Sequence, residues 1–270
     1  MTLDEATRLL AEAGVDNPRA DARLLLAHIL GVSRDLTLTA TPNPEQSGRF
    51  AALVARRARR EPFAYLTGRK EFWSLDFKVG PGVLVPRPDT ETLIEEALRL
   101  VPDRNATLRI ADLGAGSGAI LIAALKEFPN ATGIGFESSQ AAFGYASANA
   151  ARLIGTRAEI RRAGWENAKG SFDLVFSNPP YIRSGDIESL EPEVARHEPR
   201  AALDGGADGL DAYRALAGFL PGLLKPGGHA LLEIGLGQES AVGPLFRGLE
   251  LLRIAPDLSG VPRCVILRKP

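Results

Sequence analysis

One short segment, Ser177-Asn178-Pro179-Pro180-Tyr181, combines residue types that could hold a planar amide or an exocyclic amine. Such a nitrogen is a poor nucleophile, because its lone pair is delocalised into a carbonyl group or a ring. The Asn178 side-chain oxygen and the Pro179 carbonyl could accept hydrogen bonds from its two N–H groups. The two prolines offer no competing donor and stiffen the loop, and the Tyr181 ring could pack over the amide plane. The candidate catalytic residues are therefore Asn178, Pro179, Pro180 and Tyr181, and the alternative is a rigid loop with an aromatic plug.

A glycine-rich turn lies upstream, with the sequence Asp112-Leu113-Gly114-Ala115-Gly116-Ser117-Gly118-Ala119. It follows an apolar run that predicts a strand and opens a run that predicts a helix. Glycine is needed where a chain turns sharply or where a ligand lies against bare backbone. Three glycines exceed what a tight turn requires, so the turn is predicted to bind a ligand. Gly114, Gly116 and Ala119 also satisfy the dinucleotide pattern G-x-G-x-x-A, so the turn by itself leaves the ligand open.

The charge of Asp112 distinguishes the two candidate ligands. A dinucleotide would place its pyrophosphate over the turn, where this carboxylate repels it. S-adenosylmethionine has no phosphate and presents an ammonium and a sulfonium, which a carboxylate stabilises. The predicted cofactor is therefore S-adenosyl-L-methionine, with S-adenosyl-L-homocysteine as product. Its predicted contacts in this turn are Asp112, Gly114, Ala115, Gly116, Ser117 and Gly118.

Three further residues could contact the cofactor. Glu137 ends the next predicted strand, about twenty residues past the turn, where an acidic residue commonly binds ribose hydroxyls. Its alternative role is a helix-capping carboxylate near Ser138. Trp165 follows the third predicted strand and could cover an adenine ring, although tryptophans also serve as packing residues. Asn178 is a candidate for both the cofactor site and the acceptor site. Because the sulfonium sulfur is an excellent leaving group, alignment of the two molecules could supply much of the acceleration, and no general base is required.

Composition bounds the class of protein. The chain has 270 residues, 45% of them hydrophobic, with 32 basic and 33 acidic residues. The lack of a basic excess argues against extended nucleic-acid binding, which depends on phosphate contacts. Cys264 is the only cysteine and the three histidines lack ligand spacing, so no metal is expected. The acidic N-terminus and the lack of a long apolar run predict a cytoplasmic protein without a membrane anchor.

The first part of the chain, residues 1–70, is predicted to be a small helical bundle. Thr2 and Glu5 have capping-box spacing, and Asn17-Pro18 and Asn43-Pro44 are expected to open further helices. Arg56, Arg57, Arg59 and Arg60 form a dense basic cluster, which we expect to be a solvated helix face. Residues 71–88 alternate around Gly80-Pro81-Gly82 and predict a hairpin-like connector.

Residues 89–270 predict an α/β domain. Strands are expected at 108–113, 131–136, 158–162, 172–177 and 229–234, and helices at 90–100, 119–128, 140–153 and 210–224. This alternation predicts a doubly wound, mostly parallel sheet. The tail pair 251–254 and 264–267 lacks a connecting helix, so the last strand is expected to be antiparallel.

Together these features resemble class I methyltransferases of the amino-methylating type. Several further segments resemble those of release factor glutamine methyltransferases, in order and spacing, over nearly the whole chain. They are Glu61–Gly68, Glu71-Phe72-Trp73, Val85–Glu91, Glu198–Leu210 and Glu233-Ile234-Gly235.

The resemblance implies a Rossmann-like catalytic domain and an N-terminal helical domain that docks the substrate. It implies methylation of the glutamine in the Gly-Gly-Gln motif of class I peptide chain release factors, which tunes translation termination. It assigns Gly114–Gly118, Glu137 and Trp165 to the cofactor and Asn178–Tyr181 to the substrate glutamine. Two positions depart from the family pattern, which usually has Asp where this chain has Glu137 and Gly164. The missing carboxylate contact to the adenine edge could be supplied by Glu166.

Two rival functions fit parts of the sequence. A nucleic-acid adenine or guanine methyltransferase would also use Asn-Pro-Pro-Tyr, but it needs a basic groove and often a target-recognition domain. A non-catalytic S-adenosylmethionine-binding protein would have no need for the segment Ser177–Tyr181, which we call the acceptor loop. The sequence therefore favours a methyltransferase that acts on protein and has no stable nucleic-acid or membrane partner.

Overall fold

The computed structural model describes residues 1–38 and 41–270, and the chain divides into two compact units. The first unit comprises Met1–Arg69 together with Glu191–His197, and the second comprises Lys70–Leu190 together with Glu198–Pro270. The chain thus leaves the second unit after Leu190, contributes one short helix to the first unit, and returns at Glu198.

The first unit is helical, and its helix starts follow from their capping residues. Thr2 and Glu5 form the predicted capping box, since Glu5 N–H donates to Thr2 Oγ1 (3.2 Å) and Thr2 N–H donates to Glu5 Oε2 (2.8 Å). Asn43 and Gln46 form a second box, whereas the side chain of Asn17 makes no capping hydrogen bond within the described residues. The helices are α1 Leu3–Glu12, α2 Pro18–Leu30, η1 Arg34–Leu38, α3 Pro44–Ala58, α4 Phe63–Thr67 and α8 Pro192–His197.

The predicted solvated basic face is wrong for two of its four arginines. Arg57 is buried and donates to Asp21 Oδ2 (2.7 Å) and to Glu193 Oε1 (2.6 Å). Arg60 donates to both oxygens of Glu193, at 2.7 Å each. The carboxylate comes from the segment Glu191–His197, far away in sequence, so a local pattern of charges could not reveal it. These arginines hold the first unit together rather than present a free basic surface.

The connector is a hairpin, but its turn lies earlier than predicted. Strands β1 Arg69–Phe72 and β2 Leu75–Lys78 form a two-stranded sheet. The two residues between them, Trp73 and Ser74, both have positive φ (52° and 56°), as a type I′ turn requires. Gly80-Pro81-Gly82 follows β2 and forms a separate turn, in which Val83 N–H donates to the Gly80 carbonyl at 3.3 Å and Gly82 has φ of 89°. Proline followed by a glycine of positive φ is typical of a type II turn, so this turn comes after the hairpin and does not join its two strands.

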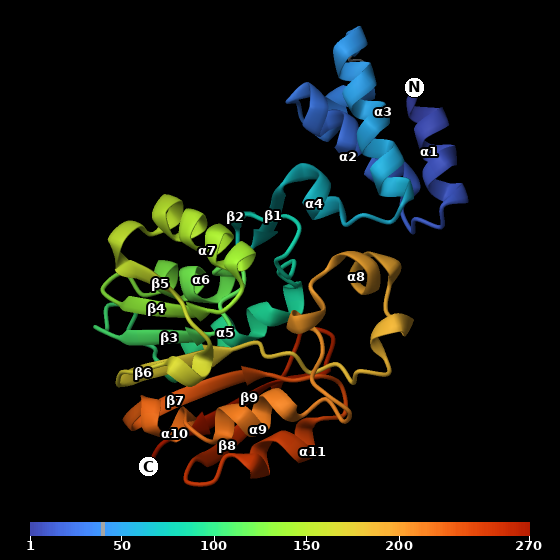
Figure 1. Ribbon diagram of the computed structural model, residues 1–270. Coiled ribbons are helices and arrows are strands. Elements are labelled where there is room, and N and C mark those ends of the chain that lie inside the picture. Colours follow the sequence, from blue (N-terminus) through green and yellow to red (C-terminus); the bar gives the residue numbers. More distant parts are fainter. Residues whose placement is uncertain (39–40) are drawn as a thin grey trace. The chain divides into compact units, whose positions relative to one another are not determined.

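A seven-stranded sheet in the order β5-β4-β3-β6-β7-β9-β8 forms the second unit (Figure 1). β9 pairs antiparallel with β7 and with β8, and the other neighbouring strands pair in parallel, which confirms the predicted class I methyltransferase arrangement. The strands are β3 Arg109–Leu113, β4 Thr132–Glu137, β5 Ala158–Arg162, β6 Phe172–Ser177, β7 Leu224–Glu233, β8 Glu250–Pro256 and β9 Pro262–Arg268.

Helices cover both faces of this sheet, with α5–α7 on one side and α9–α11 on the other (Figure 1). The second face buries an apolar cluster that includes Phe172, Leu216 and Val265. The helices are α5 Glu91–Leu100, α6 Ala119–Glu127, α7 Gln140–Leu153, α9 Asp211–Ala217, α10 Leu220–Leu223 and α11 Glu239–Val242. Short 3₁₀ turns are η2 Pro88–Thr90, η3 Gly155–Arg157, η4 Trp165–Asn167, η5 Ile187–Ser189, η6 Arg200–Ala202 and η7 Gly243–Leu245.

One predicted helix is divided in two. The sequence predicted a helix over residues 210–224, and the structure has α9 and α10 with a break at Gly218-Phe219. Pro221 explains the break, because its ring would clash with the carbonyl four residues earlier in a continuous helix. Strand β7 begins directly after α10, at Leu224, which is earlier than the predicted start at residue 229.

The start of α6 depends on Asp112. Its N-cap residue, Gly118, has no side chain with which to satisfy the first free N–H groups. Asp112, at 0% exposure, supplies an oxygen instead, since Leu121 N–H donates to Asp112 Oδ2 at 3.3 Å. Its Oδ1 is buried with no hydrogen-bond partner in residues 1–38 and 41–270. Burial accordingly raises the pKa of Asp112 from 3.8 to about 7, and the nearby charge of Glu137 adds to the shift.

This shift predicts how Asp112→Asn alters stability with pH. The unfolded chain loses the Asp112 proton near its usual pKa of 3.8, whereas the folded chain keeps it up to about pH 7. Stability from this group therefore falls as pH rises between those values. The free energy of unfolding of Asp112→Asn minus that of the parent should therefore be larger at about pH 8 than at about pH 4, by on the order of 4 kcal/mol. Urea denaturation at both pH values measures this difference.

The matched control is Asp35→Asn, which changes a carboxyl group whose side chain is 87% exposed. It should leave the pH dependence of unfolding nearly unchanged. Equal pH dependence in the parent and in Asp112→Asn would show that the buried carboxyl does not carry the shift.

Candidate functional site

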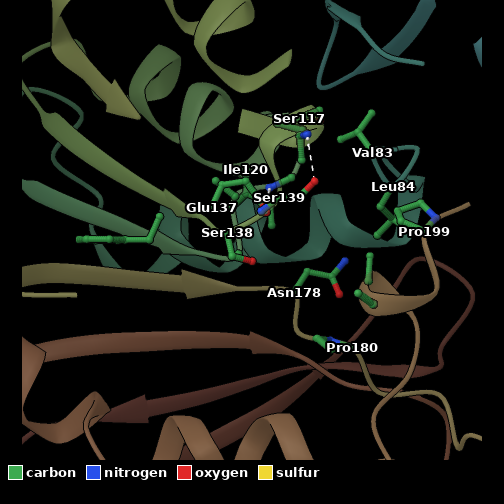
Figure 2. Close-up of a pocket in the computed structure, with 18 of the residues that line it drawn as sticks. Val83, Leu84, Ser117, Ile120, Glu137, Ser138, Ser139, Asn178, Pro180 and Pro199 are labelled. Carbon is green, nitrogen blue, oxygen red and sulfur yellow. Dashed lines mark hydrogen bonds between the residues drawn. The ribbon is translucent and has the colours of Figure 1, made fainter. Parts of the chain in front are cut away.

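A cavity of about 560 Å³ lies where the carboxyl ends of β3, β4 and β6 meet. The parallel strands bring the glycine turn, Glu137 and Asn178 to this one edge, as open α/β sheets do at their ligand sites. Figure 2 shows residues from several segments around it, with Asn178 across from Ser117, Ile120 and Glu137. Val83, Leu84 and Pro199 close a further side.

The glycine turn lines the cavity through Gly114, Ala115, Gly116 and Ser117, whereas Gly118 is buried and lies outside the lining. Gly114, Gly116 and Gly118 have φ of 81°, 58° and 82°, a left-handed conformation that other residues rarely adopt. The N–H groups of Gly114 and Ala115 donate to the Phe136 carbonyl at 2.9 and 3.0 Å, which fixes the turn against β4. A Cβ on Gly116 would meet no described atom within 4 Å, so the backbone there borders open space. The turn can therefore lie directly against a ligand.

Glu137 lines the cavity and also braces the turn. Its Oε2 accepts a hydrogen bond from Gly116 N–H (2.8 Å) and its Oε1 accepts one from Ser139 N–H (2.7 Å). Ser139 is the N-cap of α7, and its own hydroxyl accepts from Ala142 N–H, so Glu137 supports the cap residue and does not itself cap the helix. Each carboxylate oxygen can accept a further bond, so Glu137 keeps lone pairs for ribose hydroxyls. Ribose binding by Glu137 stays a prediction that this geometry permits.

Trp165 and Glu166 form the opposite end of the cofactor region. The Trp165 ring lies 3.5 Å from the position of a Cβ on Gly114, so it stands directly over the glycine turn. The Glu166 carboxylate folds back over Gly164, into the space that a side chain on residue 164 would need. Asn167 Nδ2 donates to Glu166 Oε1 at 2.8 Å and steadies it there. Gly164 thus makes room for a carboxylate that comes from two residues further along the chain.

Asn178 presents its amide to the cavity in a fixed orientation. Its Nδ2 donates to Thr90 Oγ1 at 3.3 Å, which leaves Oδ1 as an available acceptor. Pro180 also lines the cavity, whereas Pro179, Tyr181 and Asp112 lie outside its lining. The roles predicted for these three residues, amide contact for the first two and cofactor contact for Asp112, stay predictions.

The acceptor loop rests on a dense set of backbone contacts. Tyr181 hydroxyl donates to Glu233 Oε1 at 3.1 Å, and Gln238 Nε2 donates to the Tyr181 carbonyl at 3.0 Å. A Cβ on Gly205 would stand 2.8 Å from the Pro180 carbonyl oxygen, and one on Gly209 would stand 2.5 Å from the Tyr181 carbonyl oxygen. Glycine is therefore required where a second loop packs against the acceptor loop.

Another wall of the cavity is held by a buried carboxylate, Glu198. It accepts a hydrogen bond from Val85 N–H at 3.1 Å and pairs with the Arg87 guanidinium. Arg87 Nη1 donates to the Val85 carbonyl at 2.7 Å, so the segment 83–87 is fixed against the rest of the site.

The sequence predictions missed four supporting residues, Thr90, Glu198, Glu233 and Gln238. The first three lie in segments that carry the family resemblance, but only the fold shows what they touch.

No group of three or more His, Cys, Asp or Glu residues suited to a metal ion occurs in the described part of the chain. Among the same residues, no helix is long and apolar enough to cross a membrane.

Comparison with known proteins shows which families and folds this chain resembles. Residues 2–68 match the family model described as PrmC N-terminal domain, and residues 90–197 match the model described as Methyltransferase small domain. A methyltransferase from Pyrococcus furiosus, 19% identical, has the same fold with a TM-score of 0.54 over 84% of this chain and 99% of that chain.

Two relatives extend the similarity to the whole chain, and both are named release factor glutamine methyltransferase. The one from Rhodospirillum rubrum is 46% identical over 274 residues, which cover 99% of this chain and 84% of that protein. The one from Caulobacter vibrioides is 46% identical over 265 residues, which cover 95% of this chain and 91% of that protein. Identity at this level from end to end shows that the chain belongs to the release factor glutamine methyltransferase family, within the class I S-adenosylmethionine-dependent enzymes.

Proposed function

We propose that this protein methylates the side-chain amide nitrogen of the glutamine in the Gly-Gly-Gln motif of class I peptide chain release factors. The observation that carries the proposal is the fixed Asn178 amide, whose free oxygen borders the same cavity as the bare glycine turn. An acceptor group and a cofactor surface share one enclosure, as direct transfer between two bound molecules requires.

The cofactor end of the cavity suits S-adenosylmethionine. The glycine turn offers backbone for the methionine portion, Glu137 offers lone pairs for ribose hydroxyls, and Trp165 offers a ring face for adenine. When bound, the cofactor supplies an electrophilic methyl carbon on a sulfonium. The lining of Pro180, Val83 and Leu84 excludes water from that carbon.

The acceptor end would hold the glutamine amide. Asn178 Oδ1 and the Pro179 carbonyl accept its two N–H groups, and the pair of acceptors aims the nitrogen toward the glycine turn. Neither acceptor has a proton to donate, so neither offers a hydrogen bond that would turn the N–H groups of the amide away. As the new N–C bond forms, the C–S bond of the sulfonium breaks and S-adenosylhomocysteine is released. The nitrogen then passes its extra proton to solvent, so no buried base is needed.

We infer further that the first unit docks the release factor and that the protein acts in the cytoplasm, where translation factors are found. The paired state of Arg57 and Arg60 argues against a nucleic-acid substrate, because these cations are neutralised by Asp21 and Glu193.

The proposal predicts the outcome of a methyl-transfer assay with labelled S-adenosylmethionine. A purified class I release factor should accept label, and Gln→Ala in its Gly-Gly-Gln motif should abolish the transfer, because the receiving nitrogen is gone. Chelator should not change the rate. Parallel reactions with bulk RNA and DNA serve as controls, and preferential labelling of either would favour an exocyclic-amine methyltransferase. Tight cofactor binding without any labelled acceptor would point to a non-catalytic protein.

Asn178→Ala should separate acceptor binding from cofactor binding. Loss of one acceptor misplaces the amide, and misplacement of about 1 Å costs about 100-fold in rate. We therefore expect kcat to fall by about that factor, while the Kd of S-adenosylmethionine, measured by calorimetry, changes little. If the variant instead loses cofactor binding, Asn178 acts mainly on the cofactor.

Glu166 is predicted to contact the exocyclic amine of adenine. Glu166→Ala removes a charged acceptor and should weaken S-adenosylmethionine about tenfold, with kcat at saturating cofactor nearly unchanged. Gly164→Asp in the same variant places a carboxylate in the vacated space and should restore affinity. Gly164 has φ −67° and ψ 157°, which any residue adopts, so that substitution is not strained. Equal affinity in the parent and Glu166→Ala would remove Glu166 from the site.

A further inference from the structure

A buried carboxyl group beneath the acceptor loop has no place in the transfer scheme above. Glu233, at the end of β7, is 2% exposed. Its Oε1 accepts the hydrogen bond from the Tyr181 hydroxyl, and its Oε2 is buried without a geometric hydrogen-bond partner in the described residues. An acid in such a position is costly, and a well-packed apolar residue would serve stability as well or better. The fold alone therefore gives no reason for an acid at this position.

Thr90 lies between this carboxyl group and the acceptor amide. It is 4% exposed, and its Oγ1 accepts the hydrogen bond from Asn178 Nδ2. A hydroxyl that accepts one bond still has its own proton to donate. The Thr90 hydroxyl also favours the ionised form of Glu233 and so lowers the pKa of that carboxyl group.

We propose that Thr90 and Glu233 are positioning residues for methyl transfer, which hold Asn178 and Tyr181, respectively, in the orientation that the substrate amide requires. The proposal rests on the proposed function, since it assigns a task to residues around the same acceptor loop. An ionised Glu233 accepts from the Tyr181 hydroxyl through Oε1, and its unpartnered Oε2 is an acceptor toward which the Thr90 hydroxyl can turn its proton. The lone pairs of Thr90 Oγ1 then stay directed at Asn178 Nδ2, and Asn178 Oδ1 faces the cavity.

Protonation of Glu233 would disturb this arrangement. A protonated carboxyl group donates a hydrogen bond, and Thr90 Oγ1 is an acceptor that it can reach. The carboxyl proton would then compete with Asn178 Nδ2 for the same oxygen. The Asn178 amide would be free to rotate and to present its NH₂ group, a donor, to the N–H groups of the substrate.

The surroundings of Glu233 place this change near neutral pH. Burial raises its pKa from 4.5 to about 7, while Thr90, Arg263 and Tyr181 oppose the shift and Asp89 adds to it. Arg263 donates to Asp89 Oδ2 at 3.1 Å and to the Ile234 carbonyl at 3.3 Å, so its charge is held nearby. On the remaining sides, the Tyr213 hydroxyl donates to the Glu233 carbonyl (2.8 Å), and Cys264 is the paired residue on β9.

The first test is the pH dependence of kcat at saturating release factor and cofactor. The ionised form is the competent one, so kcat should rise with pH through about 7, the pKa of Glu233. Glu233→Gln cannot ionise, so its kcat should be flat from about pH 5.5 to about pH 8.5 and stay below the parent plateau. A rise of the parent's size that persists in Glu233→Gln would overturn the proposal.

The second test does not depend on titration. Thr90→Val keeps the shape of the side chain and removes the hydroxyl, so kcat should fall about tenfold. The Kd of S-adenosylmethionine should stay within about twofold of the parent value, which also shows that the variant is folded. Thr90→Ser restores the hydroxyl and should recover most of the loss. Equal loss in Thr90→Val and Thr90→Ser would mean that Thr90 acts through packing alone.

The two levels of the hypothesis fail differently. If the parent protein does not label release factor at all, the proposed function is wrong. If the parent labels it, and both Thr90→Val and Glu233→Gln match its kcat and pH profile, the function stands and only the positioning role is refuted.

Discussion

An amide nitrogen shares its lone pair with its carbonyl group, so a site that alkylates it must supply alignment rather than strong activation. Alignment is useful only if the aligning atoms are themselves immobile. In this protein the side-chain acceptor that we propose is the oxygen of Asn178, whose amide nitrogen donates to Thr90. The loop that carries Asn178 is tied in turn through Tyr181 to Glu233 and Gln238. The rigidity of the site therefore comes from β7 and the loops behind it, and not from the Asn-Pro-Pro-Tyr residues alone.

The need for a rigid acceptor loop also explains two glycines outside the glycine turn. Gly205 and Gly209 lie in the loop that backs the acceptor loop, where any side chain would meet the carbonyl oxygens of Pro180 and Tyr181. Ile182 N–H donates to the Leu203 carbonyl and Gly205 N–H donates to the Ile182 carbonyl, at 2.9 and 2.8 Å, so the two loops meet in an isolated parallel β-bridge. Close backbone pairing fixes Pro180 without enlarging the apolar core.

The sequence predicted the sheet well because strand and helix periods alternate with little ambiguity between residues 108 and 234. Even the antiparallel last strand followed from the short connection between β8 and β9. It misplaced the hairpin turn, because positive φ at Trp73 and Ser74 carries no glycine or asparagine signal. It also misjudged Arg57, whose partner Glu193 lies 136 residues away. The sequence pointed to candidate residues that lie in motifs, such as Asn178 and Glu137. Thr90 and Glu233 were identified only from their hydrogen bonds to Asn178 and Tyr181.

The departure at Gly164 shows how a local conformation can move a functional group between positions. Residues 165–167 form a 3₁₀ turn, which has about three residues per turn and is therefore tighter than an α-helix. A glutamate in that turn has enough length to reach back over residue 164, and a glycine there removes the side chain that would block it. The carboxylate then borders the same cavity as the Trp165 ring, although its Cα belongs to a different residue. An alignment of sequences would show that the usual carboxylate at position 164 is missing. In the structure the Glu166 carboxylate occupies the space beside Gly164, so the proposed adenine site depends on Gly164 and Glu166 together.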